Sequence, residues 1–321
     1  MMVQVLDVEP VRYRSHPLHG SDRIWKETNC AADLWIEALH SLGFDPVAAL
    51  GFTLSADFDG DQWRMFTFPA EDLRVLFGIE MDELNVWRPL VEHLVDQLAL
   101  RRLVVVDVDA WYLPDTAGLT YRCAHQKTSV MVQMLDVGAR RLGYFHNRGY
   151  HVLEGEDFAA LLDPPAVADA AVLPPFALSV RLDGLRPADD TTDARALALG
   201  LAHLARRPQT NPVARLRKRI DEDLPWLRRH DLDTFHRYAF GTVRQCGANA
   251  ELAADFAAWL DGRPGRGRAD AAPLFTGVAA GMKSIEFSLA RAARGRSCDL
   301  EGLFAEHEVA WDEAMDRLAR V

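Results

Sequence analysis

Cys30 is the residue of this sequence whose type and position best suit chemistry. It opens a stretch with apolar residues at helical spacing, which predicts a helix over 30–42. Thr28 and Asn29, just before it, carry short side-chain oxygens of the kind that cap helix N-termini. Because the unpaired amides and the dipole at that end favour negative charge, they can stabilise a thiolate and a developing oxyanion. We therefore expect Cys30 to be a nucleophile; the alternative is a small buried side chain in a packed helix.

A nucleophilic cysteine needs a base nearby in space and a third group that orients the base. His125 is the best placed histidine, because it precedes a predicted strand over 128–135 and can face a helix N-terminus from the edge of a sheet. Asn147 follows the next predicted strand, 141–146, and could hydrogen-bond the imidazole. These residues are the candidate dyad and its orienting partner.

The register of the two strands leaves the third group open. If their turn is centred near Gly138, antiparallel pairing brings His125 opposite about His151 rather than Asn147. A β-bulge would restore the match to Asn147. An asparagine suffices chemically, as the neutral orienting group of a Cys-His-Asn arrangement.

Several motifs of the chain resemble known families. Asn29-Cys30 at the head of the amphipathic helix, DAWYLP at 109–114 and His125 before the hairpin resemble the papain-like acyltransferase family typified by butirosin biosynthesis protein H. A closer resemblance, to a related conserved bacterial family of unknown function, lies in ETNCAADLWIEALHSLGFDP, GDQW, ELNVWRPL and LGYFHN. The closer resemblance covers most of the chain, whereas that to the acyltransferases covers the N-terminal half.

The resemblance to the acyltransferases implies a fold and a reaction. It implies a papain-like (cysteine-peptidase-like) N-terminal domain, in which the cysteine accepts an acyl group from the phosphopantetheine thioester of a carrier protein and passes it to an amine. By this resemblance Cys30 is the nucleophile, His125 is the base and Asn147 is the third member, where the family usually has aspartate.

The oxyanion site departs from the pattern of papain-like enzymes, which usually have a side-chain amide a few residues before the cysteine. This chain has Glu27 there, which would position an acceptor amine or pair with a lysine. The backbone amides of Cys30 and Ala31, with Asn29, are then expected to hold the oxyanion.

We therefore expect an acyltransferase that moves an acyl group, preferably aminoacyl, from an acyl or aminoacyl carrier protein to an amine or alcohol of a small-molecule acceptor. The phosphopantetheine arm is a co-substrate, and no cofactor or metal ion is expected to be bound by the chain itself. Two alternatives remain open. One is a cysteine peptidase or amidase with the same dyad, and the other is a catalytically silent partner-binding protein on a protease-like scaffold.

Periodicity predicts an α+β N-terminal part followed by an all-helical C-terminal part. Short β-branched or apolar runs predict strands over 103–108, 128–135 and 141–146. Prolines and acidic residues then accumulate, and beyond 193 Ala, Leu and Arg follow a helical period. We expect a papain-like catalytic domain over 1–165, a Pro-rich linker over 166–190 and a helical domain over 191–321.

Composition excludes several classes of function. With 36 Lys and Arg against 47 Asp and Glu, the net charge of −11 argues against nucleic acid as a partner. No apolar run approaches the roughly 20 residues that span a bilayer. Asp7 and Glu9 stand where a signal peptide would be apolar, so we expect a cytoplasmic protein without membrane contact.

The histidines and cysteines predict no metal site. The four cysteines are scattered and form no CxxC pair, which excludes the usual zinc knuckles and disulfide frameworks. His16 and His19 are three residues apart without a third ligand nearby, so they are predicted to lie in a solvated loop.

Overall fold

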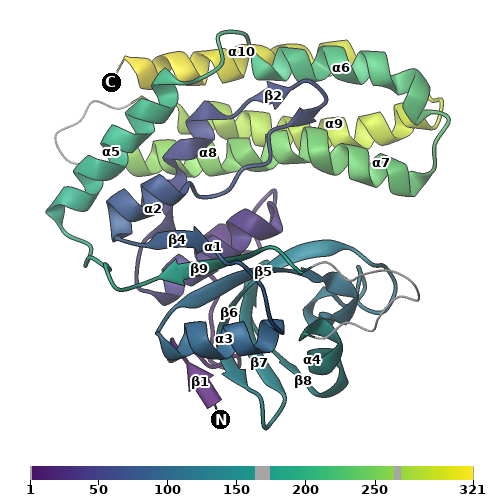
Figure 1. The fold of residues 1–321 in the computed structure, drawn as a ribbon. Coiled ribbons are helices and arrows are strands. Elements are labelled where there is room, and N and C mark those ends of the chain that lie inside the picture. Colours follow the sequence, from purple (N-terminus) through teal and green to yellow (C-terminus); the bar gives the residue numbers. More distant parts are fainter. Residues whose placement is uncertain (1, 163–173, 264–268, 321) are drawn as a thin grey trace. The chain divides into compact units, whose positions relative to one another are not determined.

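The computed structural model describes residues 2–162, 174–263 and 269–320, and the chain divides into two compact units (Figure 1). The sheet unit comprises Met1–Gly20, Asn29–Asp45 and Ala70–Ala188. The helical unit comprises Ser21–Thr28, Pro46–Pro69 and Asp189–Val321. The units therefore do not follow a single cut in the chain, because two N-terminal segments belong to the helical unit.

The sheet unit is built on an antiparallel sheet. The strand order is β4-β9-β5-β6-β7-β8, and β1 pairs with the end of β6 that lies beyond β5. The run LVVVDVD forms β5 at the centre, where its valines are almost fully buried, as expected for β-branched residues in a core strand. The strands are β1 (Met2–Gln4), β4 (Glu80–Glu83), β5 (Leu103–Asp109), β6 (Lys127–Asp136), β7 (Arg141–His146), β8 (Gly149–Glu154) and β9 (Ala177–Arg181).

Four α-helices accompany this sheet. Helix α1 contacts β6, β7 and β8, whereas α3 contacts β1, β5 and β6 and α4 contacts β7 and β8. Short 3-10 turns connect these elements at Pro17–His19, Ala110–Tyr112 and Pro114–Thr116. The helices are α1 (Cys30–Ser41), α2 (Ala70–Phe77), α3 (Leu90–Ala99) and α4 (Gly155–Leu162).

In the helical unit, four of the six described α-helices pack around the pair α8 and α9. A 3-10 segment, Pro46–Ser55, contacts α5 and α8, and a hairpin of β2 (Phe58–Asp59) and β3 (Gln62–Trp63) places Trp63 edge-on against Trp311 in the core. A π-helical segment, Phe240–Arg244, joins α7 directly to α8. The helices are α5 (Asp190–Ala205), α6 (Pro212–Leu227), α7 (Leu232–Ala239), α8 (Gln245–Asp261), α9 (Ala272–Ala293) and α10 (Leu300–Ala319).

The predicted α+β class and the helical C-terminal part are confirmed. Part of the predicted linker is not a linker: Ala177–Arg181 is β9, which pairs with β4 and β5 inside the sheet. Residues 166–173 of that linker lie outside the described residues. Segment 46–69 joins the helical unit because its apolar side chains are buried against helices there. None of the described helices is long and apolar enough to cross a membrane.

Candidate active site

Cys30 is the first residue of α1 and is half-buried. Asn29 precedes it in extended conformation and caps the helix, because its Oδ1 accepts from the backbone N–H of Ala32 at 3.0 Å. The cap and the helix over Cys30–Ser41 confirm the prediction for this segment. Ala31 lies in the first turn, where helical amides lack intrahelical acceptors. Cys30 thus stands at the end of α1 that favours negative charge.

Helix α1 packs on one identifiable face of the sheet. The Tyr13 hydroxyl donates to the Glu37 carboxylate on α1, and the Tyr13 ring contacts those of Phe145 and Tyr150. Phe145 pairs with Tyr150 across β7 and β8, and with Met131 across β6 and β7. Because directly paired residues point to the same face, α1 covers the face that carries Met131, Phe145 and Tyr150.

The same face carries a polar row where β5 ends and β6 begins. Side chains two residues apart share a face, so Ser129 and Lys127 lie on the face of Met131. Their partners across the ladder are Asp107 and Asp109. Ser129 Oγ donates to Asp107 at 2.6 Å, and Lys127 Nζ lies 3.0 Å from the other oxygen of that carboxylate. The polar row and α1 therefore share one face of the sheet.

His125 joins this row through Asp109. Its Nδ1 lies 2.6 Å from Asp109 Oδ2, and the other oxygen of Asp109 accepts from the backbone N–H groups of Trp111 and Gln126 at 3.0 and 3.2 Å. The Trp111 ring stacks on the imidazole at a centroid distance of 4.4 Å and an angle of 9°. The His125 side chain is 66% exposed. When Nδ1–H donates to the carboxylate, Nε2 of the neutral ring carries the lone pair and can act as a base.

Asn147 occupies a different kind of position. It lies in the two-residue turn between β7 and β8, because His146 pairs with Gly149. Its φ of +46° is in the left-handed region, which asparagine tolerates better than most residues. Asp109 is the residue that orients His125 in the structure, whereas Asn147 is a residue of the β7–β8 turn. A bulge does occur between β6 and β7, at Val132–Met134, but it does not join Asn147 to His125.

The structure does not join all of the expected residues. Within residues 2–162, no hydrogen bond or ion pair links Cys30, His125 and Asn147 to one another. Glu27 belongs to the segment Ser21–Thr28 of the helical unit. Cys30 and His125 both belong to the sheet unit. Because side chains alternate along β5 and β6, Asp109, which bonds His125, points to the face of the sheet that α1 covers.

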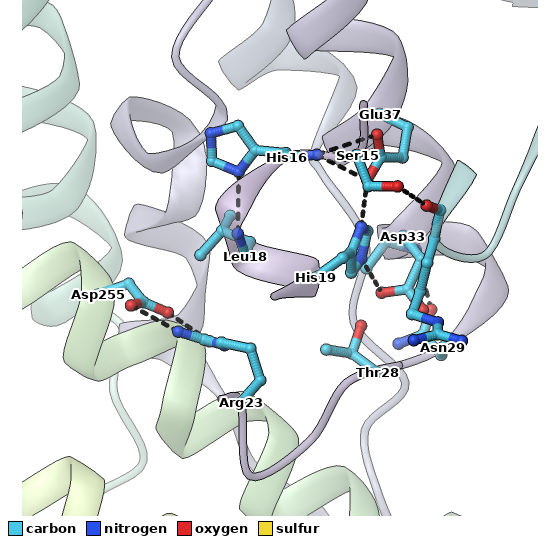
Figure 2. Close-up of polar contacts among 12 residues, drawn as sticks. Ser15, His16, Leu18, His19, Arg23, Thr28, Asn29, Asp33, Glu37 and Asp255 are labelled. Atoms are coloured by element: carbon cyan, nitrogen blue, oxygen red, sulfur yellow. Dashed lines mark hydrogen bonds and ion pairs between the residues drawn. The ribbon is translucent and has the colours of Figure 1, made fainter. Parts of the chain in front are cut away.

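A buried histidine of the 3-10 turn Pro17–His19 lies between two carboxylates of α1, which follow Cys30 by one and two helical turns (Figure 2). His19 Nδ1 bonds to Glu37 Oε1, and His19 Nε2 lies 3.3 Å from Asp33 Oδ1. All three of these side chains are fully buried. Glu37 also accepts from the backbone N–H of His16 at 3.2 Å. We call His19, Asp33 and Glu37 the buried triad.

The charge of the buried triad follows from its surroundings. Burial alone would lower the pKa of His19, but the hydrogen bonds and charges of Asp33 and Glu37 outweigh it and raise that pKa to about 9. His19 is therefore an imidazolium at neutral pH. The pKa of His16 falls to about 4, because burial and the neighbouring His40 both oppose its charge. The prediction that His19 lies in a solvated loop is therefore wrong, because its side chain is buried and paired with Asp33 and Glu37.

A second histidine–carboxylate cluster joins β7 and β8 to the 3-10 turn Pro114–Thr116, which precedes β6. His146 Nδ1 lies 2.6 Å from Asp115 Oδ2, and His146 Nε2 lies 2.8 Å from Thr128 Oγ1. Tyr144 donates to the other oxygen of Asp115 at 2.5 Å, and His151 Nε2 is 4.0 Å from that carboxylate. Burial opposes the charge of Asp115, yet His146 lowers its pKa. Because His146 and Asp115 are almost fully buried, this cluster stabilises the sheet rather than facing substrate.

Neither cluster was foreseen from the sequence. Asp33 and Glu37 follow Cys30 at helical spacing, and two acidic residues on an apolar helical face are a signal for a buried cation. His19 could be matched to them only through the path of the chain before α1. Asp109 was part of a recognised motif, but its contact with His125 depends on the register of β5 and β6.

Two family models together cover most of the chain. Residues 14–182 match the DUF1839 N-terminal domain, and residues 190–320 match the DUF1839 C-terminal domain. The chain belongs to the DUF1839 family. This confirms the expected membership of a family of unknown function. No curated protein matches the chain.

The N-terminal domain of this DUF1839 protein holds the groups for nucleophilic chemistry. Cys30 supplies a thiol at a helix N-terminus, and His125 with Asp109 supplies an exposed, oriented imidazole. Within residues 2–162, 174–263 and 269–320, no three His, Cys, Asp or Glu side chains are arranged to hold a metal ion.

Proposed function

We propose that this DUF1839 protein is a cysteine-dependent acyltransferase with a papain-like N-terminal domain. The observation that carries the proposal is that one face of the sheet bears both α1, which begins at Cys30, and the polar row to which the His125–Asp109 pair belongs. A thiol at a helix N-terminus and an imidazole oriented by a carboxylate are the parts of a nucleophile and its general base.

The proposed reaction has two halves. In the first, His125 Nε2 takes the proton of the Cys30 thiol, and the sulfur attacks the carbonyl carbon of a thioester. The oxyanion is stabilised by the backbone amide of Cys30 and the positive end of the α1 dipole. When the tetrahedral intermediate collapses, the donor C–S bond breaks and the imidazolium returns its proton to the departing thiolate. The product of this half is an acyl thioester on Cys30.

In the second half an acceptor attacks the Cys30 thioester. His125 takes a proton from the attacking amine or hydroxyl, the C–S bond to Cys30 breaks, and the thiol form of Cys30 is regenerated. Asp109 holds the imidazole through Nδ1 in both halves and stabilises the imidazolium that forms.

The donor we propose is the phosphopantetheine thioester of an acyl or aminoacyl carrier protein, and the acceptor is a small-molecule amine or alcohol. Two points support this choice. Exchange of one thioester for another is close to thermoneutral, so a thioester donor can load Cys30 without an activating step. The motifs around Cys30 and His125 resemble those of acyltransferases that use carrier proteins.

The test is formation of the acyl-enzyme. The full chain is incubated with an acyl-pantetheine thioester, and the adduct is located by intact mass and peptide mapping. We expect a hydroxylamine-sensitive adduct on Cys30, lost in Cys30→Ala and kept in Cys123→Ala, which removes an exposed thiol. His125→Ala should slow its formation by about 100-fold or more. An adduct that persists in a folded Cys30→Ala would exclude this function, and release to water without an acceptor would indicate a peptidase or amidase instead.

A further inference from the structure

Arg244 stands at the end of an irregular helical turn in the helical unit. It is the last residue of the π-helical segment Phe240–Arg244, which joins α7 to α8 and contacts α9 (Figure 1). Single π-helical turns inside α-helices are uncommon and occur frequently at functional sites. Thr242 in this segment is buried and its hydroxyl donates to the carbonyl of Tyr238. The segment is therefore a packed part of the helix.

The guanidinium of Arg244 is half-buried and lacks an acidic partner. Its Nε is buried without a hydrogen bond, and its carbon lies 5.9 Å from the centre of the Phe240 ring. Within residues 2–162, 174–263 and 269–320, no carboxylate oxygen lies within 4.0 Å of it and no side-chain nitrogen of Arg244 has a hydrogen bond. A buried N–H without an acceptor is costly, and the half-buried guanidinium leaves its other N–H groups open to an incoming acceptor.

Other arginines with a buried Nε show what is missing at Arg244. Arg23 pairs with Asp255 at 2.6 Å, Arg263 lies 3.1 Å from Asp193 through its Nε, and Arg215 pairs with Asp57, which precedes β2. The guanidinium of each of these arginines therefore has a carboxylate partner. Among the described arginines with a buried, unbonded Nε, Arg244 differs in having neither a carboxylate nor an amide oxygen.

The acidic residues of the adjoining helix cannot serve Arg244 as they stand. Glu251 accepts from the backbone N–H groups of Ile24 and Trp25 at 2.9 and 2.8 Å. Asp255 is held by a two-pronged contact with Arg23, and Asp261 accepts from backbone N–H groups at the start of the α9 region. The three carboxylates of α8 are thus committed to other donors.

Trp25, of the segment Ser21–Thr28, packs between α8 and a cation of α9. Trp25 packs against Gly247 of α8, and Lys283 Nζ of α9 lies 4.2 Å from the centre of the Trp25 ring. Lys283 Nζ also lies 3.3 Å from Glu286 Oε2, so a carboxylate of α9 already pairs with this cation. Arg244 therefore differs from Lys283 in having no carboxylate partner among the described residues.

The residue after Arg244 is bonded to a distant segment of the helical unit. Gln245 donates to the carbonyl of Thr28 at 3.0 Å. Gln245 therefore anchors the segment Ser21–Thr28 to the first turn of α8.

We propose that Arg244 is an anion-binding residue that takes a phosphate or carboxylate group of a small-molecule ligand. The planar guanidinium presents paired N–H donors that match both groups. The proposal concerns the helical unit alone and stands whether or not Cys30 forms a thioester.

The test measures anion affinity directly. Inorganic phosphate and acetate are titrated separately into the full chain by calorimetry, for the wild type, Arg244→Gln, Arg244→Lys and Arg237→Gln. Arg237 is the matched control, since it lies on the adjoining α7, is 73% exposed and pairs with Asp233. Circular dichroism checks the fold, and Arg244→Lys keeps the charge if the glutamine variant does not fold.

We expect at least one of the two anions to bind the wild type. Its affinity should fall about tenfold or more in Arg244→Gln, because a lost charged hydrogen bond of roughly 1.4 kcal/mol corresponds to that factor. Arg244→Lys should lose less, and Arg237→Gln should stay within about twofold of the wild type. The preferred anion identifies the ligand group. The proposal is overturned if neither anion binds, or if affinity is unchanged in the Arg244 variants.

Discussion

Replacing His19 by glutamine should change how the stability of the sheet unit depends on pH. His19 is held between Asp33 and Glu37 with its side chain fully buried, and its pKa is raised from 6.5 to about 9. The folded state therefore holds the proton of His19 more tightly than the unfolded chain does. Its contribution to stability is complete below pH 6.5, declines between pH 6.5 and about 9, and is lost above that range.

The size of this change in stability follows from the rise in the pKa of His19. A rise of about 2.5 pKa units, at roughly 1.4 kcal/mol per unit, makes the His19 proton worth about 3 kcal/mol of unfolding free energy. This is a large part of the roughly 5–15 kcal/mol of unfolding free energy that is typical of a whole protein. His19→Gln removes the titrating group but leaves a donor that can still reach one carboxylate.

The assay is urea-induced unfolding at pH 6.0 and pH 9.5, followed by fluorescence and circular dichroism. Between pH 6.0 and pH 9.5 the unfolding free energy of the wild type should fall by about 3 kcal/mol more than that of His19→Gln. Comparing the two proteins cancels the other groups that titrate in this range. His16→Gln is the matched control: folded His16 is neutral at both pH values, and its protonation in the unfolded chain at pH 6.0 makes the control lose about 1 kcal/mol more than the wild type, opposite in sign to the effect of His19→Gln. If the wild type and His19→Gln lose the same free energy, the reasoning about the buried triad is refuted.

Three further predictions follow from burial and packing. His16→Gln should make the protein less sensitive to acid between pH 6 and about 4, because the lowered pKa of His16 favours proton uptake by the unfolded chain; acid titration by circular dichroism measures this. Gly247→Ala should destabilise the helical unit by ~1–3 kcal/mol, because the new Cβ would lie 2.6 Å from the Trp25 ring. Gly277→Ala has open space around its Cβ and should stabilise α9 by ~0.5–1 kcal/mol. Urea unfolding measures both variants, and equal effects would contradict this packing. Cys246 is fully buried and burial raises the pKa of its thiol, so alkylation followed by peptide mapping should find it unmodified until the helical unit unfolds.

Local signals in the sequence were sufficient for several elements. Asn29 and the apolar spacing after it predict α1 because capping and amphipathicity act within a few residues, and β7 is observed over Arg141–His146 as expected. Strand β9 was missed because the prolines around it dominate the local pattern, whereas its pairing partners, such as Leu103 for Val180, lie far away in the chain.

The candidate site was predictable only in part. The position of Cys30 at a helix N-terminus follows from local sequence, and so does the place of His125 before β6. The Asp109 contact of His125 required the register of β5 and β6, which depends on pairing between distant residues. The buried triad required the path of residues 13–19 over α1, which no periodicity encodes.

The assignment of Ser21–Thr28 to the helical unit has a consequence for how the protein can be divided and inherited. Arg23 pairs with Asp255, and Glu251 accepts from the amides of Ile24 and Trp25, so α8 depends on residues encoded more than 200 positions earlier. A gene cut near residue 189 would separate those partners and leave the carboxylates of α8 without their donors. The two halves are therefore expected to be expressed, engineered and passed on as one chain, even though two domain models match them.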